Sequence, residues 1–163
     1  MKFLPQTKEY KHMIIEKYFN MIYRLAVSQT KDIHNAEDIT NEVFLKYMNS
    51  SKTFESEEHI KAWLIRVTVN SSKSLFSSSW FKKNVPLEED IPVDMPEEES
   101  EVYGAVLKLP PKYRAVIHLF YYEDMKTAQI AQILNLKETT VRSQLSRARD
   151  MLKEILKGDD YFV

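Results

Sequence analysis

Residues 127–156 read TAQIAQILNLKETTVRSQLSRARDMLKEIL, the most informative pattern in the chain. Two apolar runs at helical spacing flank a short polar turn, which predicts two helices joined tightly. Ala131 is small where the helices must cross, Asn135 stands where the turn requires a left-handed residue, and Val141 anchors the second helix on the first. This spacing is typical of a helix-turn-helix.

The second helix of this motif, from Glu138, has one apolar and one polar face. At about 100° per residue, its apolar residues form a narrow stripe that we expect to face the core. The stripe consists of Val141, Leu145, Ala148, Leu152 and Ile155. The polar face consists of Thr139, Ser143, Ser146 and Asp150, and Arg142 and Arg147 flank it. Hydroxyls between arginines suit the major groove of DNA, because arginine bonds guanine bidentately. A solvated face of a helical bundle is the alternative interpretation.

The composition favours helices and excludes several classes of protein. The 163 residues include two glycines and no cysteine. Few glycines argue against phosphate-cradling loops and turn-rich β folds, and the lack of cysteine excludes disulfides, thiol catalysis and thiolate metal sites. No apolar run approaches the roughly 20 residues of a membrane span, and no secretory signal is recognisable. We therefore expect an all-α, cytoplasmic protein without membrane insertion, cofactor or metal.

Net charge changes sign twice along the chain. Residues 1–84 carry a net charge of +4, residues 85–101 a net charge of −8, and residues 102–163 a net charge of +3. Two basic lobes joined by an acidic segment suit a protein that faces nucleic acid, and ordinary surfaces with an acidic loop are the alternative. We predict domains at 1–80 and 102–163, and a flexible acidic linker at 81–101, where prolines and like charges disfavour regular structure.

Three helices are predicted in the N-terminal domain. Apolar residues recur at helical spacing over 9–28, and a second amphipathic pattern begins near Asn35, which we expect to cap it. A polar loop at 49–58 leads into a third helix over 57–76. Its expected inner stripe consists of Ile60, Trp63, Leu64, Val67, Ser71 and Leu75. Because of their spacing, Arg66, Asn70 and Lys73 share another face of that helix.

Prolines and caps predict the helix ends of the C-terminal domain. A short helix is expected to run through Leu109 and stop at Pro110, and the next to begin with Pro111 at the first helical position. Thr127 is the expected cap of the first helix of the helix-turn-helix. The four histidines of the chain are scattered, and none lies in an HExxH or triad-like setting. We therefore expect no enzymatic activity.

Three segments together resemble a known family. With LPPKYRAVIHLFYYEDM at 109–125, the helix-turn-helix resembles the −35-binding domain of extracytoplasmic-function sigma factors of bacterial RNA polymerase. AEDITNEVFLKYM at 36–48 resembles the family's helix that docks on the β′ clamp, and HIKAWLIRVTVNSSKSLF at 59–76 resembles its −10-reading helix. The resemblance implies a factor that directs core RNA polymerase to specific promoters and assists promoter melting.

The resemblance also implies roles for single residues. The loop at 50–58 matches the segment that captures a base flipped from the non-template strand, and its one aromatic residue is Phe54. A base would stack on this ring, or Phe54 instead fills the domain's own core. Trp63 fits core packing better than a melting wedge. The positions that match the −35 contacts are Thr140, Arg142, Ser143, Ser146 and Arg147. Those that match the −10 contacts are Phe54, Arg66, Asn70 and Lys73. The candidates for contact with polymerase are Asp38, Asn41 and Glu42.

The family implies three partners: core RNA polymerase through its β′ clamp and β flap, promoter DNA, and an anti-sigma factor. Two features depart from the family pattern. After the −10 helix, SLFSSSWFKK supplies only Lys82 and Lys83 where an arginine-rich tail is usual, which predicts a shallower salt dependence of DNA binding. Lys137 stands where a Ser or Thr cap is expected. The rival interpretation is a helix-turn-helix transcriptional regulator that acts without docking on polymerase.

Overall fold

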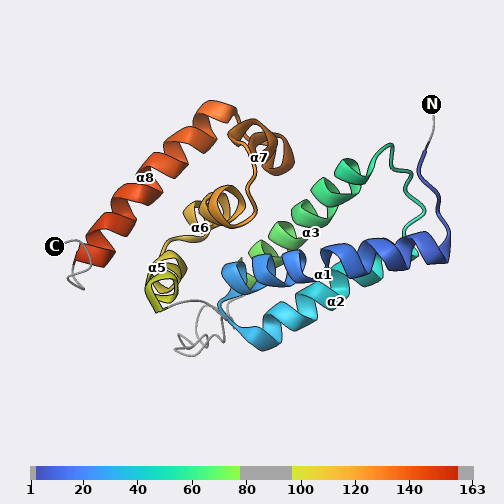
Figure 1. Cartoon of the computed structure of the whole chain (residues 1–163), viewed down its shortest axis with the longest axis horizontal. Helices are drawn as coiled ribbons and strands as arrows, with labels where there is room; N and C mark the ends of the chain where they lie inside the picture. Colours follow the sequence, from blue (N-terminus) through green and yellow to red (C-terminus); the bar gives the residue numbers. More distant parts are fainter. Residues whose placement is uncertain (1–2, 78–96, 158–163) are drawn as a thin grey trace. The chain divides into compact units, whose positions relative to one another are not determined.

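The computed structural model describes residues 3–77 and 97–157, which belong to two compact units within residues 1–87 and 88–163. Every regular element of these residues is a helix (Figure 1). The prediction of an all-α chain with two small helical domains is therefore confirmed. Within the same residues, no helix has both the length and the apolar character needed to cross a membrane. The predicted linker falls outside the described residues as far as position 96.

The N-terminal unit consists of α1 (Lys8–Thr30), α2 (Ile33–Asn49) and α3 (Glu57–Ser77), and each helix packs against the other two (Figure 1). Thr7 caps α1 by accepting a hydrogen bond from the Tyr10 N–H. The cap of α2 is Asp32, whose carboxylate accepts from the Asn35 N–H at 3.2 Å. The predicted cap Asn35 thus lies within the first turn. Both residue types are good caps, so the sequence pattern alone could not separate them.

The inner stripe predicted for α3 is correct only in its first half. Ile60 and Leu64 are buried, whereas Val67, Ser71 and Leu75 are half-buried and line a groove beside α2. The buried positions of the second half are Ile65, Thr68, Val69 and Ser72. The two hydroxyls are satisfied within the helix, since Thr68 donates to the Leu64 carbonyl and Ser72 to the Thr68 carbonyl. Because the buried face contains hydroxyl residues, the apolar pattern of the sequence did not identify it.

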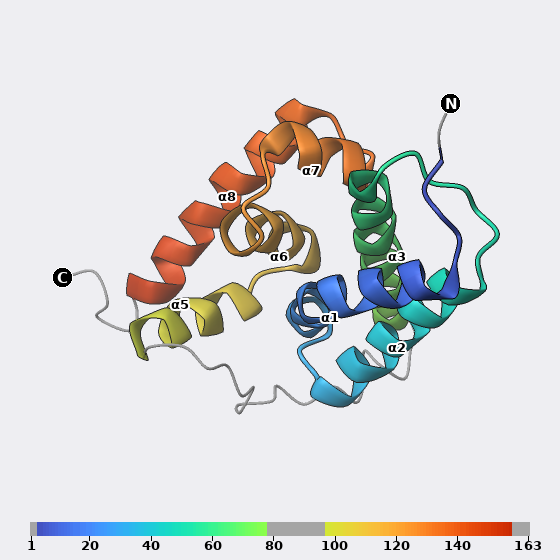
Figure 2. The ribbon, with the colours of Figure 1, turned by 45° about the vertical axis from the view of Figure 1, so that its right-hand side comes forward.

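The C-terminal unit contains α5 (Glu97–Leu107), α6 (Pro111–Ile117), the π-helical turn η1 (His118–Tyr122), α7 (Thr127–Leu134) and α8 (Glu138–Lys157). The long helix α8 packs against α5, α6 and α7 (Figure 2). The predicted start of α6 at Pro111 is confirmed. Helix α5 begins inside the stretch predicted as linker, so the linker prediction is wrong for residues 97–101. Acidic residues are favoured in a first helical turn by the helix dipole, which explains how a glutamate run can be helical.

A buried arginine closes the turn between α5 and α6. Arg114 is buried, and its Nη1 donates to the carbonyls of Leu107 at 3.2 Å and Leu109 at 3.0 Å. Helix α5 ends at Leu107, two residues earlier than predicted, and the carbonyl of this last helical residue is bonded by the Arg114 side chain. Burial lowers the pKa of Arg114 to about 10, which leaves the guanidinium protonated at neutral pH.

The turn of the helix-turn-helix has the predicted geometry. Asn135 lies in the left-handed region, with φ 57° and ψ 48°, and the Leu136 N–H donates to the Ala131 carbonyl at 2.8 Å. Val141 is fully buried. Thr127 is the first residue of α7 and not its cap, which is Lys126. The Thr127 hydroxyl instead donates to Glu138 Oε1 at 2.9 Å, and this bond joins the two helices of the motif.

Substitution of Asn135 tests this turn. Asn135→Val is expected to lower the free energy of unfolding by about 1 to 2 kcal/mol, because a β-branched residue is strained at positive φ. Asn135→Gly removes the side chain but tolerates the same backbone, so its change should stay below about 1 kcal/mol. Urea denaturation followed by circular dichroism measures both. Equal losses would contradict a conformational role of this position.

Candidate functional site

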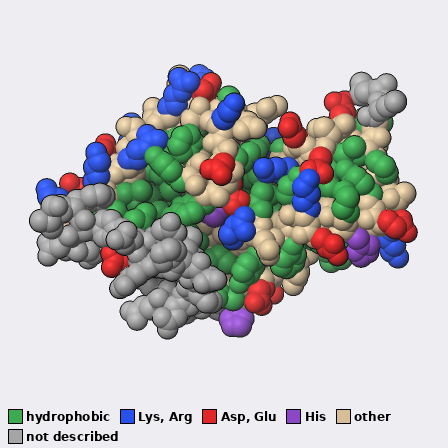
Figure 3. Space-filling model, in the orientation of Figure 1, with side chains coloured by type: hydrophobic (Ala, Val, Ile, Leu, Met, Phe, Trp, Pro, Cys, Tyr) green, Lys and Arg blue, Asp and Glu red, His purple; other side chains and the backbone are tan. Residues whose placement is uncertain are grey.

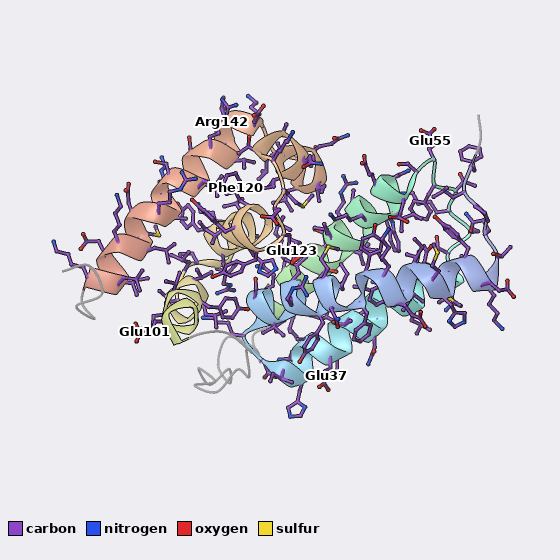
Figure 4. All side chains as sticks on the ribbon, in the orientation of Figure 1. Glu37, Glu55, Glu101, Phe120, Glu123 and Arg142 are labelled. Atoms are coloured by element: carbon purple, nitrogen blue, oxygen red, sulfur yellow. The ribbon has the colours of Figure 1, made fainter. Side chains whose placement is uncertain are left out.

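The exposed face of α8 brings together most of the predicted −35 residues. Arg142, Ser143, Ser146 and Arg147 are exposed, and Thr140 is half-buried at the margin of this face. Of the predicted stripe, Val141, Leu145 and Ala148 are buried, while Leu152 and Ile155 are half-buried. Lys and Arg side chains follow the outer margin of α8 in Figure 3, and Figure 4 shows Arg142 pointing away from the unit. The helix thus presents a cationic, hydroxyl-rich face whose chemistry suits phosphates and base edges.

Glu138 connects this face to the rest of the motif. Its Oε1 accepts hydrogen bonds from Arg142 Nη2 at 2.7 Å and from the Thr127 hydroxyl. The Arg142 side chain remains 66% exposed, so it can exchange this carboxylate for a phosphate or a base. Glu138 was not among the predicted site residues, although its place four residues before Arg142 is the spacing of a helical ion pair. The Val141 N–H donates the first intrahelical bond of α8 to the Lys137 carbonyl, which places Lys137 at the N-cap position, as the sequence predicts.

The predicted −10 residues of α3 share one exposed face. Arg66, Asn70 and Lys73 are all exposed, as the helical spacing predicts. Phe54 does not join them, since its side chain is only 3% exposed. Asn70 differs from its two neighbours in that it also lines the groove between α3 and α2. The exposed face is therefore formed by two basic side chains with one amide between them.

The groove between α2 and α3 has a volume of about 670 Å³ and brings two predicted sites together. Asp38 and Glu42, predicted for polymerase contact, lie along it opposite Asn70. Asn41 is exposed on α2 but does not line the groove. The lining residues are Asn35, Asp38, Ile39, Glu42, Lys46, Val67, Asn70, Ser71, Ser74 and Leu75. Periodicity assigns a face to each helix separately, so it could not reveal that the two faces meet.

Phe54 belongs to an aromatic cluster at one end of this unit. Its ring centre lies 6.1 Å from that of Tyr47, 5.1 Å from His59 and 5.9 Å from Trp63. This packing supports the core alternative for Phe54, and a base cannot stack directly on its ring in this conformation. Trp63 is half-buried in the same cluster, in agreement with core packing. Burial raises the pKa of Tyr47 in the cluster to about 12.

Glu57 ties the start of α3 to α1. Its Oε2 accepts hydrogen bonds from Lys17 Nζ at 2.6 Å and from the Tyr18 hydroxyl at 2.6 Å. The bond from Lys17, followed by that from Tyr18, lowers the pKa of Glu57 below its usual 4.5. Burial, reinforced by the bond to Glu57, raises the pKa of the Tyr18 hydroxyl. The loop before α3 therefore ends at a charged anchor.

The stabilisation that Glu57 provides through its bonds to Lys17 and Tyr18 should depend on pH. Because the folded-state pKa of Glu57 is lowered, its contribution to stability is full above pH 4.5 and is lost as pH falls through the folded value. Glu57→Gln should therefore destabilise the chain at neutral pH, by less than about 1 kcal/mol for so exposed a pair, and have a smaller effect near pH 3. Urea denaturation at both pH values measures this, with Glu58→Gln as the control. A loss of equal size at both pH values would contradict the assignment.

Family models match both units. The Sigma-70 region 2 model matches residues 14–81, and the Sigma-70 region 4 model matches residues 99–152. These segments contain the groove of the N-terminal unit and, as far as Leu152, the helix-turn-helix of the C-terminal unit. Within residues 3–77 and 97–157, no group of three or more His, Cys, Asp or Glu is placed to hold a metal ion.

Relatives match over most of the chain. The ECF RNA polymerase sigma factor SigW of Bacillus subtilis (strain 168) is 27% identical over 164 residues, covering 88% of this chain and 87% of the relative. SigM of the same organism is 28% identical over 153 residues, covering 87% and 92%.

Two solved structures have a similar fold. The sigma factor RpoE of Bartonella quintana, in complex with the anti-sigma factor NepR, has a TM-score of 0.71 at 21% identity, covering 93% of this chain and 98% of that one. CnrH, in complex with the cytosolic domain of CnrY, has a TM-score of 0.72 at 19% identity, covering 94% and 91%. A regulator that carried only a helix-turn-helix would lack the region 2 match. The chain belongs to the sigma-70 family and is an extracytoplasmic-function sigma factor, a transcription initiation factor.

Proposed function

We propose that the two units divide promoter recognition between them. The N-terminal unit docks on the β′ clamp of core RNA polymerase through Asp38, Asn41 and Glu42 and faces the −10 element with Arg66, Asn70 and Lys73. Its loop at residues 50–58 captures a base flipped from the non-template strand. The C-terminal unit reads the −35 element with the exposed face of α8, including Thr140 at its margin, and contacts the β flap. Each unit alone binds weakly, and polymerase fixes their separation so that both elements are bound together.

The observation that carries this proposal is the separation of charge between the faces. The α8 face and the α3 face hold exposed arginines and lysine, which suit DNA, whereas Asp38 and Glu42 place carboxylates on α2. Glu42 is paired with Lys46 of the same helix at 3.0 Å, so Asp38 is the carboxylate that contributes most to repelling DNA phosphates and to attracting a cationic protein surface. The N-terminal unit thus offers surfaces for two different partners.

An inhibitory partner is the second part of the proposal. RpoE was solved in complex with the anti-sigma factor NepR, and CnrH in complex with the cytosolic domain of CnrY. We propose that an anti-sigma factor also binds this chain, in the cytoplasm, and competes with polymerase for it. Such a partner would have to cover the carboxylates of α2, since these are the residues proposed to dock on the clamp.

Run-off transcription with purified core polymerase on a random promoter library tests this function. We expect transcripts that depend on the added chain, and start sites preceded by two enriched sequence elements at a constant separation. If no start depended on the chain, and the chain did not bind core polymerase, the proposed function would be wrong. A regulator without polymerase docking would then be the remaining interpretation.

A further inference from the structure

The loop at residues 50–56, between α2 and α3, is bonded to the N-terminal end of the chain at three points. Three of its backbone carbonyls accept hydrogen bonds from groups in residues 4–11. These bonds run from Lys11 Nζ to Ser50 O at 3.0 Å, from Gln6 Nε2 to Lys52 O at 2.7 Å, and from Leu4 N to Phe54 O at 2.9 Å. The path of the loop therefore depends on residues at least 39 positions away in the sequence.

Lys11 is the buried member of this set. Its side chain is 8% exposed, and Nζ also donates to the carbonyls of Tyr47 at 3.4 Å and Met48 at 3.1 Å. The carbonyls at a helix C-terminus lack partners within the helix and form the negative end of its dipole. An ammonium group at this place satisfies them and fixes the direction in which the chain leaves α2. The cation also lies 5.6 Å from the centre of the Tyr47 ring.

The bonded loop presents polar groups outward and one ring inward. Phe54 is buried in the aromatic cluster, while Ser51, Lys52 and Thr53 are exposed. A flipped base that approaches this loop meets these three side chains and the backbone between them, and not the face of Phe54. Their positions are set by the carbonyls of residues 50, 52 and 54, which the N-terminal segment holds.

We infer that Lys11 and residues 4–6 are positioning elements that hold this loop in the shape that receives a flipped base. The inference rests on the proposed function, in which the loop captures a base of the non-template strand. Side chains of a binding site need to be held within about 0.5 Å by surrounding hydrogen bonds, and the three bonds to the loop supply that support. Lys11 itself lies beneath the loop and does not contact the base.

The test compares base preference and not overall activity. Full-length variants are assembled with core polymerase on a promoter recovered from the library, and each non-template base of the −10 element is changed in turn. For Lys11→Met, we expect the preference at one position to fall about tenfold, as when one or two hydrogen bonds to a base are lost, while the preferences at the other positions stay unchanged. Lys8→Met removes the same charge from an exposed place on α1 and should keep the wild-type pattern.

A second variant covers the case in which Lys11→Met does not fold, as judged by circular dichroism. Gln6 is exposed, so Gln6→Ala removes one bond to the loop and leaves the core intact, and we expect about a threefold fall at the same position. Preference that stays unchanged, or falls equally at every position, in a folded variant would overturn the inference. If the unaltered chain gave no dependent starts, the proposed function would fail, and the inference with it.

Discussion

Asp38→Lys is expected to weaken binding to core RNA polymerase strongly and, as a result, to reduce transcription from every promoter. Asp38 is exposed on α2 and lines the groove with Glu42. The substitution reverses one of the two carboxylates proposed to dock on the clamp. Since like charges brought together across an interface cost several kcal/mol, we expect affinity to fall at least about a hundredfold. Fluorescence anisotropy of the labelled chain, titrated with core polymerase, measures the affinity.

Glu37→Lys is the matched control for this effect. Glu37 is also an exposed carboxylate of α2, and Figure 4 shows it pointing into solvent, but it does not line the groove. The two variants have the same net charge, so any difference between them reflects position. We expect Glu37→Lys to bind core polymerase with nearly the wild-type affinity. Equal weakening by both would show that only net charge matters, and normal binding by Asp38→Lys would exclude this docking surface.

Arg147→Ala is expected to reduce transcription about ten- to a hundredfold from promoters that carry the matched −35 element, because one bidentate contact to guanine is lost. Arg147 is exposed on α8, on the face opposite the buried Val141, Leu145 and Ala148. Binding to core polymerase and the preference for −10 bases should stay unchanged. Run-off transcription on promoters with single −35 substitutions measures the loss and identifies the base concerned.

The control for Arg147→Ala is Lys108→Ala, which removes one positive charge from an exposed position between α5 and α6. We expect it to leave both −35 preference and core binding unchanged. A loss of core binding in Arg147→Ala equal to its loss of transcription would indicate misfolding. An unchanged preference for every −35 base would contradict the assignment of this arginine.

The helix-turn-helix could be predicted closely because its constraints are local. Asn135 must adopt a left-handed conformation, Ala131 must be small, and Val141 must be buried, and each requirement limits the residue type at its own position. The exposed sets on α3 and α8 followed from helical spacing for the same reason. A pattern that depends only on neighbours three or four residues apart is visible in one sequence.

Contacts between distant segments could not be predicted. Lys11 resembles any other lysine on an amphipathic helix until its three carbonyl partners around Ser50 are known. Thr68 and Ser72 are buried because α3 packs against two helices at once, which widens its buried face. Phe54 was equally compatible with DNA contact and core packing, and only the positions of its ring neighbours distinguish them. In each case the missing information is the packing partner.

The spacing between the two promoter elements provides the most direct test of the central claim, that polymerase holds both units so that they read two elements together. The measurement is run-off transcription with core polymerase from one recovered promoter, with base pairs inserted between the elements. Insertion of about five base pairs, half a helical turn, should place the −35 element on the opposite side of the DNA. We predict that it removes factor-dependent transcription, and that an insertion of one base pair has a small effect. Transcription that is unchanged by the longer insertion would contradict the claim.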